Sequence, residues 1–159
     1  MAVATVYTDG SADNMKGTGG YGIVFSSTIK GKKHIKKHSS NKYCDTTNNR
    51  MEMKGILKAL QMCKPGHTID IHSDSKYCID IINLSLVVWI NNGKLKDKKN
   101  PSLWLKIWEV IQDHKSKGSN LHFIWIRGHA GNSMNEIADK LAREARLQIK
   151  TGISCKTNN

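Results

Sequence analysis

The chain has 159 residues, 38% of them hydrophobic and 24% charged, which predicts one globular domain and excludes a disordered chain. No apolar run approaches the roughly 20 residues of a membrane-spanning helix, and the first residues, MAVATVYTDG, carry no basic leader; we therefore expect a cytoplasmic protein without membrane contact. A net charge of +12 favours a polyanionic partner, most often a nucleic acid, over a charge that serves only solubility.

The four cysteines form no CxxC pair and are spread over the chain at Cys44, Cys63, Cys78 and Cys155. This spacing predicts free thiols in a reducing compartment and argues against a zinc site. Nothing in the sequence signals a dimer, so a monomer is expected.

The first half of the chain predicts three strands and a helix. The strands are VATVYT (3–8), YGIVFSST (21–28) and KKHIKKHSS (32–40). The segment 10–20 is expected to be a loop, and the lysines of the third strand fit an edge strand that resists unwanted pairing. A helix over 48–62 follows and ends before KPGH (64–67).

The second half alternates strands with helices. The predicted elements are a strand over 68–73, a helix over 75–84, an undefined basic stretch over 86–100, a helix over 102–115, a strand over 121–126 and a helix over 134–149. Early strands joined by short turns favour antiparallel pairing, and later strands separated by helices favour parallel pairing. We therefore expect an α/β fold whose mixed five-stranded sheet, three antiparallel strands and then two parallel, is flanked by helices. The domain is expected to span 1–150, with a polar tail over 151–159.

Acidic residues stand where several of these elements begin or end. Asp9 closes the first predicted strand and Asp74 the fourth, so parallel pairing would bring both to the carboxyl edge of the sheet, where α/β sheets bind ligands. Glu52 lies on the apolar stripe of its helix, and Asp139 flanks the stripe of the last helix. Four converging carboxylates require a cation between them. Oxygen ligands suit Mg²⁺ or Mn²⁺, and a pair of such ions suits in-line displacement at phosphorus.

Each candidate also has a structural explanation. Asp74 could cap the next helix, Asp9 could serve a turn, and Asp139 could be a surface charge. Glu52 is the hardest to explain in this way, because a buried carboxylate without a partner is costly. His129, in the glycine-flanked loop RGHAGNS, fits either a proton shuttle or an exposed loop histidine.

Six motifs, YTDGS, GGYG, TTNNRMEM, SDSKY, IRGHAGN and NEIADKLAR, occur in an order and at intervals that resemble type 1 ribonuclease H over residues 3–147. The resemblance implies a ribonuclease H-like fold and an endonuclease that cuts the RNA strand of RNA·DNA hybrids, leaving 5′-phosphate and 3′-hydroxyl ends. It implies two divalent ions, Mg²⁺ or Mn²⁺, held by Asp9, Glu52, Asp74 and Asp139, with Asp9 bridging both. His129 would assist product release or protonate the leaving group.

The resemblance also implies a set of substrate-binding residues. Asn48 and Asn49 would reach base edges and 2′-hydroxyls in the minor groove of the hybrid, and Thr47 and Asn100 would hold a phosphate of the DNA strand. Lys76 stands where bacterial relatives often have glutamine, and it would add a phosphate contact. The basic segment 91–100 carries the lysines of the family's protrusion without its tryptophans, so its grip on the DNA strand is expected to differ.

Two alternatives stay open at this point. The chain could be the ribonuclease H domain of a reverse transcriptase, or a module that binds hybrids without cutting them. The near-complete, self-contained match favours a free-standing enzyme over a reverse-transcriptase domain, and the presence of all four acids and the histidine argues against a module without catalysis.

Overall fold

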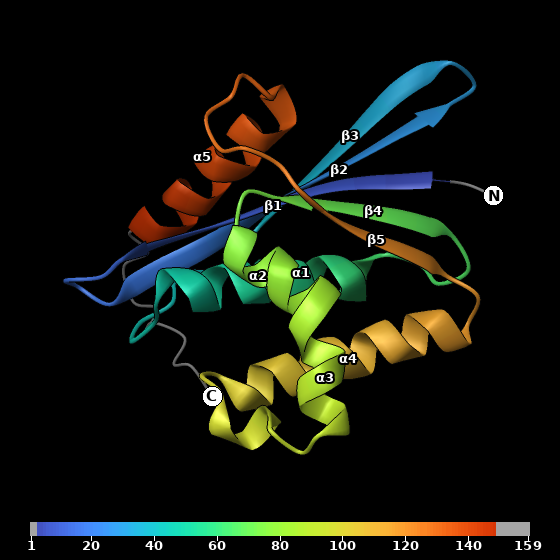
Figure 1. Cartoon of the computed structure of the whole chain (residues 1–159). Coiled ribbons are helices and arrows are strands. Elements are labelled where there is room, and N and C mark those ends of the chain that lie inside the picture. The colour runs from blue at the N-terminus through green and yellow to red at the C-terminus, as the bar shows by residue number, and fades with distance from the viewer. Residues whose placement is uncertain (1–2, 149–159) are drawn as a thin grey trace.

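The computed structural model describes residues 3–148, so the predicted boundary at 150 and the tail over 151–159 lie outside the described residues. In chain order the elements are β1 (Val3–Asp13), β2 (Thr18–Ile29), β3 (Lys32–Ser39), α1 (Asn48–Met62), β4 (Thr68–Ser73), α2 (Lys76–Asp80), the π-helical turn η1 (Ile81–Ser85), α3 (Leu86–Asn91), the 3-10 turn η2 (Leu95–Asp97), α4 (Pro101–Ser116), β5 (Asn120–Trp125) and α5 (Ser133–Leu147). The strands form one sheet in the order β3-β2-β1-β4-β5 (Figure 1). Pairing is antiparallel from β3 to β1 and parallel from β1 to β5, which confirms the predicted mixed sheet.

Helices cover both faces of this sheet (Figure 1). The larger core lies between the sheet and the helices α1 and α4, where Ile23, Ile56 and Trp104 are fully buried. The smaller core lies under α5, where Val24 packs with Ala138. Adjacent residues of a strand point to opposite faces, so the neighbours Ile23 and Val24 contribute to different cores. Among residues 3–148, no helix combines the length and the apolar composition needed to cross a bilayer.

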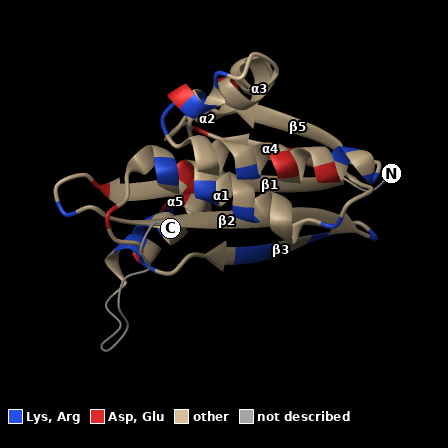
Figure 2. Cartoon of the chain, turned by 90° about the horizontal axis from the view of Figure 1, so that it is seen from below, with Lys and Arg blue, Asp and Glu red and all other residues tan. Residues whose placement is uncertain are grey.

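β3 is an edge strand, as the sequence predicted, and its lysines lie on the exposed border of the sheet (Figure 2). The prediction of free thiols is correct for Cys63 and Cys78 but wrong for Cys44, which is disulfide-bonded; Cys155 lies outside the described residues. Disulfide formation depends on proximity in three dimensions, which the cysteine spacing does not reveal.

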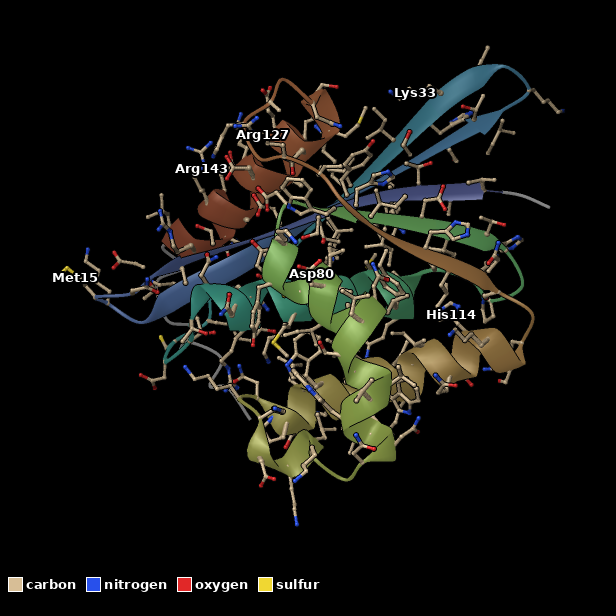
Figure 3. The ribbon with its side chains drawn as sticks, in the orientation of Figure 1. Met15, Lys33, Asp80, His114, Arg127 and Arg143 are labelled. Carbon is tan, nitrogen blue, oxygen red and sulfur yellow. The ribbon has the colours of Figure 1, made fainter. Side chains whose placement is uncertain are left out.

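The segment 10–20 is not the expected loop. β1 continues to Asp13 and β2 begins at Thr18, so the turn is short, with the exposed Met15 in it (Figure 3). Gly20, one of the glycines that suggested a loop, is required by the close approach of α5, because a Cβ there would lie 2.5 Å from Cβ of Ala145. The same approach continues along β2, where a Cβ on Gly22 would lie 2.4 Å from the carbonyl oxygen of Ala138. Asp9 consequently lies inside β1 rather than at its end, which also excludes a role for Asp9 in a turn.

We expect Gly22→Ala to lower the free energy of unfolding by about 1–3 kcal/mol or more, because α5 must move away from the sheet to admit a methyl group. Gly55→Ala is the matched control. The nearest atom to a Cβ there, Cβ of Tyr21, lies at 3.4 Å, and alanine stabilises a helix interior by up to about 1 kcal/mol over glycine. Urea unfolding measures both changes, and equal midpoints for Gly22→Ala and wild type would contradict the close packing.

The region between β4 and α4 contains four short helical pieces, α2, η1, α3 and η2, rather than one helix. The predicted helix over 75–84 is divided between α2 and the π-helical turn η1, and α3 occupies part of the stretch that the sequence left undefined. The side-chain oxygen of Ser75 accepts the backbone N–H of Cys78 at 3.2 Å and caps α2. This bond excludes the alternative in which Asp74 serves as the helix cap.

Candidate functional site

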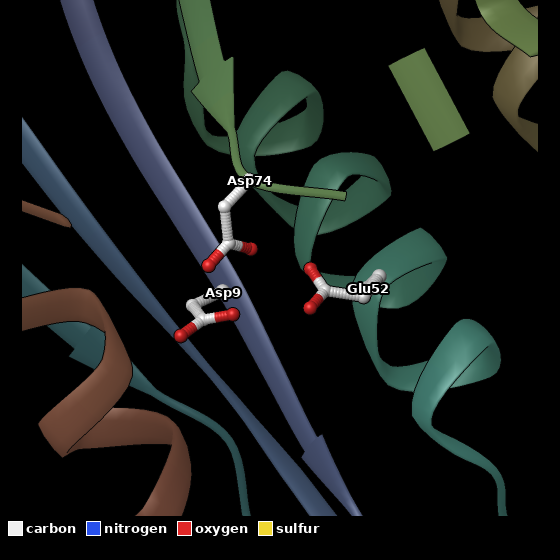
Figure 4. Close-up of side chains that lie close together, drawn as sticks. All are labelled: Asp9, Glu52 and Asp74. Carbon is white, nitrogen blue, oxygen red and sulfur yellow. The ribbon is translucent and has the colours of Figure 1, made fainter. Parts of the chain in front are cut away.

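Three carboxylates from different elements meet at one place: Asp9 from β1, Glu52 from α1 and Asp74 from the residue after β4 (Figure 4). Each offers an oxygen, and these atoms all lie within 4.8 Å of one another. Asp9 is 5% exposed and Glu52 4% exposed, whereas Asp74 is half-buried. Parallel pairing of β1 with β4 therefore brings two of the predicted acids together, and the inward face of α1 supplies the third.

A close approach of β1 to α1 makes this cluster possible. A Cβ on Gly10 would lie only 2.4 Å from the backbone nitrogen of Glu52, so only glycine fits at that position. The same residue donates its backbone N–H to Oδ1 of Asp9 at 2.9 Å, which fixes the direction of that carboxylate. The sequence DG in YTDGS thus serves to bring the helix onto the strand.

The electrostatics of the cluster favour protonation in the absence of a cation. Burial and then the charge of Asp74 raise the pKa of Asp9 to about 8. Burial and then the charge of Asp9 raise the pKa of Glu52 well above its usual range, and burial raises that of Asp74. Oε2 of Glu52 is buried and has no hydrogen-bond partner within the described part of the chain.

These features fit a divalent cation. Hard oxygen ligands at short mutual distance, one of them buried without a partner, are the donors that Mg²⁺ and Mn²⁺ take. A bound ion would offset both the burial and the mutual repulsion that raise the pKa values of this cluster.

The cluster opens into a cleft of about 350 Å³ that Asp139, His129 and Asn48 also line. Asp139 is not one of the three grouped carboxylates, and its Oδ2 lies 3.0 Å from Nη2 of Arg143 one turn along α5. It still acts on the cluster: after burial and the charge of Asp74, the charge of Asp139 also raises the pKa of Asp9. His129 is exposed, with a left-handed backbone (φ 54°), in the loop between β5 and α5.

The predicted substrate-binding residues lie in two groups. At the start of α1, Oγ1 of Thr47 accepts the backbone N–H of Arg50 and caps the helix, while Asn48 and Asn49 are exposed beside it. Asn100 precedes α4 with a left-handed backbone (φ 56°).

Lys76, the expected phosphate contact, has an acidic partner on its own helix. Its Nζ lies 2.6 Å from Oδ2 of Asp80, in an exposed ion pair along α2. A residue of this kind reaches a substrate only by leaving that partner. Exposed ion pairs of this kind contribute only about 0.3–0.5 kcal/mol to the stability of a helix, so Lys76 can leave Asp80 for a phosphate at little energetic cost.

Arg50 is the functional candidate that the sequence reading missed. Its Nη1 donates to Oδ1 of Asn100 at 3.0 Å, which ties the start of α1 to the start of α4. Its Nε is buried without a hydrogen-bond partner among the described residues. Arg50 is visible in the sequence as the arginine of TTNNRMEM. Its contact with Asn100, fifty positions later, depends on the tertiary structure and cannot be predicted from the spacing of the motif.

Comparisons with known proteins agree with this geometry. The family model described as RNase H matches residues 1–146. Proteins named Ribonuclease H from Mesorhizobium japonicum and Actinobacillus pleuropneumoniae are each 37% identical to the chain; the alignments cover 92% and 90% of it, and 80% and 90% of the relatives. The solved structure titled LC9-RNase H1, a type 1 RNase H with the type 2 active-site motif, superposes with a TM-score of 0.78 at 25% identity, covering 91% of this chain and 72% of that one. The chain therefore belongs to the ribonuclease H family.

Proposed function

We propose that this chain is an endonuclease that hydrolyses the RNA strand of RNA·DNA hybrids with two Mg²⁺ ions, leaving 5′-phosphate and 3′-hydroxyl ends. The observation that carries the proposal is the group of three carboxylates, Asp9, Glu52 and Asp74, whose nearest oxygens lie within 4.8 Å at the base of an open cleft. The net charge of +12 supports a polyanionic substrate. We also propose that the protein acts as a monomer in the cytoplasm. Light scattering tests the monomeric state.

The residues of the cleft would have different roles in the reaction. Asp9, Glu52 and Asp74 would hold the metal ions, and Asp139 would join them from α5 while still in contact with Arg143. When bound, two divalent ions supply an activated water and stabilise the charge on the leaving 3′-oxygen. His129, exposed in the loop between β5 and α5, would carry a proton to that oxygen or assist release of the product.

Substrate selection would come from the start of α1 and the helices around residue 100. Asn48 and Asn49 would contact the minor groove, where the 2′-hydroxyls of RNA differ from DNA. Thr47 and Asn100 would hold a phosphate of the DNA strand. In the basic segment, Nζ of Lys98 lies 4.8 Å from the centre of the Trp89 ring, so a tryptophan does anchor this segment, although it precedes the lysines in sequence.

The proposal is tested with end-labelled RNA·DNA hybrid, double-stranded RNA and double-stranded DNA, each incubated with Mg²⁺, Mn²⁺ or EDTA. We expect internal cuts in the RNA of the hybrid alone, and only with metal. Binding of the hybrid without cutting, under all metal conditions, would instead identify a binding module. Cutting of double-stranded RNA at a comparable rate would contradict selection through the DNA strand.

Arg50→Ala is expected to raise the KM for the hybrid about tenfold while kcat changes less than about twofold, because a hydrogen bond to a charged group contributes about 1.5–3 kcal/mol and here it only positions Asn100. The pair Arg50→Ala and Asn100→Ala forms a double-mutant cycle. If Arg50 acts through Asn100, its loss has no further effect on KM once Asn100 is alanine. Additive effects would show that Arg50 contacts the substrate independently.

A further inference from the structure

A pocket of about 250 Å³ lies in the groove between α1 and α4, on the side of the sheet that faces the viewer in Figure 2. At the starts of the two helices, Nη1 of Arg50 donates to Oδ1 of Asn100 at 3.0 Å. Nearer their ends, Nε2 of His114 lies 2.7 Å from the carbonyl oxygen of Leu60. The pocket shares no lining residue with the carboxylate cleft, so the proposed metal site does not account for it.

The side chains that line this groove are basic or carry hydroxyl groups. Lys54 and Lys58 come from α1 and Lys106 from α4, and no aspartate or glutamate is among the lining residues. Lys58 and Lys106 form no ion pair with any residue between 3 and 148. Two tyrosines, Tyr21 and Tyr43, complete the lining on the side of the sheet. The groove therefore presents positive charge that no acidic lining residue compensates.

The tyrosines are fixed in place and can donate hydrogen bonds. The backbone N–H of Tyr43 donates to the carbonyl oxygen of Gly19 at 2.8 Å, and Nζ of Lys54 lies 4.8 Å from the centre of the Tyr43 ring. Burial and then the charge of Tyr43 raise the pKa of Tyr21, so its hydroxyl keeps its proton at neutral pH. Ammonium groups and hydroxyls together match an anion with several acceptor oxygens, which is the chemistry of a phosphate.

The floor of the groove offers no apolar anchor. Leu57 and Leu103 line it, but each is only 9% exposed because both pack in the main core. A protein segment placed here would bury little apolar surface, whereas the centre of a protein–protein interface is apolar. The lining therefore favours a phosphate over a protein side chain.

Helix α1 separates this groove from the carboxylate cleft. Glu52 faces the cleft, and Lys54 follows it by two residues, or about 200° around the helix, so their side chains lie on different flanks of α1. Asn48 and Asn49, which we propose enter the minor groove of the hybrid, lie at the start of the same helix. The two strands of a duplex border its minor groove on opposite sides. With the RNA backbone at the cleft, the DNA backbone lies on the flank of α1 that carries Lys54.

We propose that the α1–α4 groove binds phosphates of the DNA strand beyond the one assigned to Thr47 and Asn100. This inference rests on the proposed action on RNA·DNA hybrids. Lys58 follows Thr47 by eleven residues, or about 16 Å along α1, so the groove reaches phosphates that Thr47 does not. Such contacts position the backbone and carry no preference for base sequence. A free phosphate ester is the other source of the same chemistry.

The test is a salt titration of hybrid binding in EDTA with the full chain. Each lysine–phosphate contact contributes about 0.9 to the slope of log K against log salt, so Lys106→Ala is expected to lower the slope by about 0.9 and to weaken binding about eightfold at 0.1 M salt. Adding Lys58→Ala is expected to double the loss of slope. Lys115→Ala is the matched control, because Lys115 is also an exposed lysine of α4 but does not line the groove, and its slope should equal that of wild type.

Equal slopes for Lys106→Ala and Lys115→Ala would overturn the proposal, provided that thermal unfolding shows both variants folded. Two further measurements identify the strand and the source of the phosphate. Uncharged methylphosphonate linkages in the DNA strand are expected to weaken binding by wild type more than by the double variant, and the same linkages in the RNA strand to weaken both equally. The reverse pattern would assign the groove to the RNA strand. Binding of a deoxynucleoside monophosphate that requires Lys58 and Lys106 but does not compete with hybrid would assign it to a small phosphate ester, and either result would overturn the proposal.

Cleavage with Mg²⁺ separates this inference from the proposed function. If wild type binds hybrid with the expected lysine dependence but cuts nothing, the endonuclease is refuted and the groove is not. If wild type cuts hybrid and the lysine variants bind it as wild type does, the groove alone is refuted.

Discussion

Asp9→Asn is expected to lower the rate of hybrid cleavage at least about a thousandfold while hybrid binding is retained. Loss of a residue that merely orients a metal ligand costs 10–100-fold, so loss of a ligand shared by the whole cluster costs more. Asp9 lies among the grouped oxygens, and asparagine has nearly its shape but one neutral donor in place of a carboxylate oxygen. The measurement is single-turnover cleavage at saturating enzyme, which separates the chemical step from binding.

Asp113→Asn provides the matched control for this substitution. It removes the same charge from an exposed ion pair with Lys117 on α4, away from the cleft, and is expected to leave cleavage unchanged. Binding of the hybrid in EDTA should be equal or slightly tighter for Asp9→Asn, because one negative charge near the phosphates is removed. Substantial Mg²⁺-dependent cleavage by Asp9→Asn would show that Asp9 is not a ligand the reaction requires.

The fold was largely predictable because its elements are locally consistent. Helix α1 and strand β4 have the predicted bounds, since the apolar period and the breakers at each end agree. The glycine-rich stretch of β1 and β2 was not predictable in this way. Its strand state depends on contact with α5, more than a hundred residues away in sequence, and local propensity carries no such information.

The functional site was likewise predictable only in part. Asp9, Glu52 and Asp74 follow from sheet topology and helix period, and the structure brings them together. The position of Asp139 beside Arg143, the pairing of Lys76 with Asp80 and the link from Arg50 to Asn100 depend on rotamers and tertiary contacts. A motif identifies such residues but does not determine which atoms they touch.

The metal-free protein is expected to lose stability as the pH rises from about 4 to about 8. Burial raises the pKa of Asp9 from 3.8 to about 8, so over this range the folded state holds a proton that the unfolded chain has released. The stabilisation is complete below the unfolded pKa and is lost as the pH passes the folded one. Because water enters a metal-free cleft, we expect a change of the order of 3 kcal/mol rather than the full linkage value. Urea unfolding in EDTA at pH 5 and pH 9 measures it.

Mg²⁺ should reverse this dependence, since the ion binds the ionised carboxylates and displaces their protons. Its stabilising effect, measured by thermal unfolding, is therefore expected to be larger at pH 8 than at pH 5.

Glu52→Gln separates the effect of the buried carboxylate on folding stability from its role in metal binding and cleavage. Glutamine occupies the same buried space without a charge, so in EDTA at pH 8 this variant is expected to be more stable than wild type by about 1–3 kcal/mol. It should gain little from Mg²⁺ and cleave hybrid at least about a thousandfold more slowly. Glu109→Gln, an exposed acid on α4, is the matched control and should behave as wild type in all three measurements. A metal-free Glu52→Gln that is less stable than wild type at pH 8 would show that the carboxylate supports the fold. In that case its inward position would reflect packing and hydrogen bonding rather than metal binding.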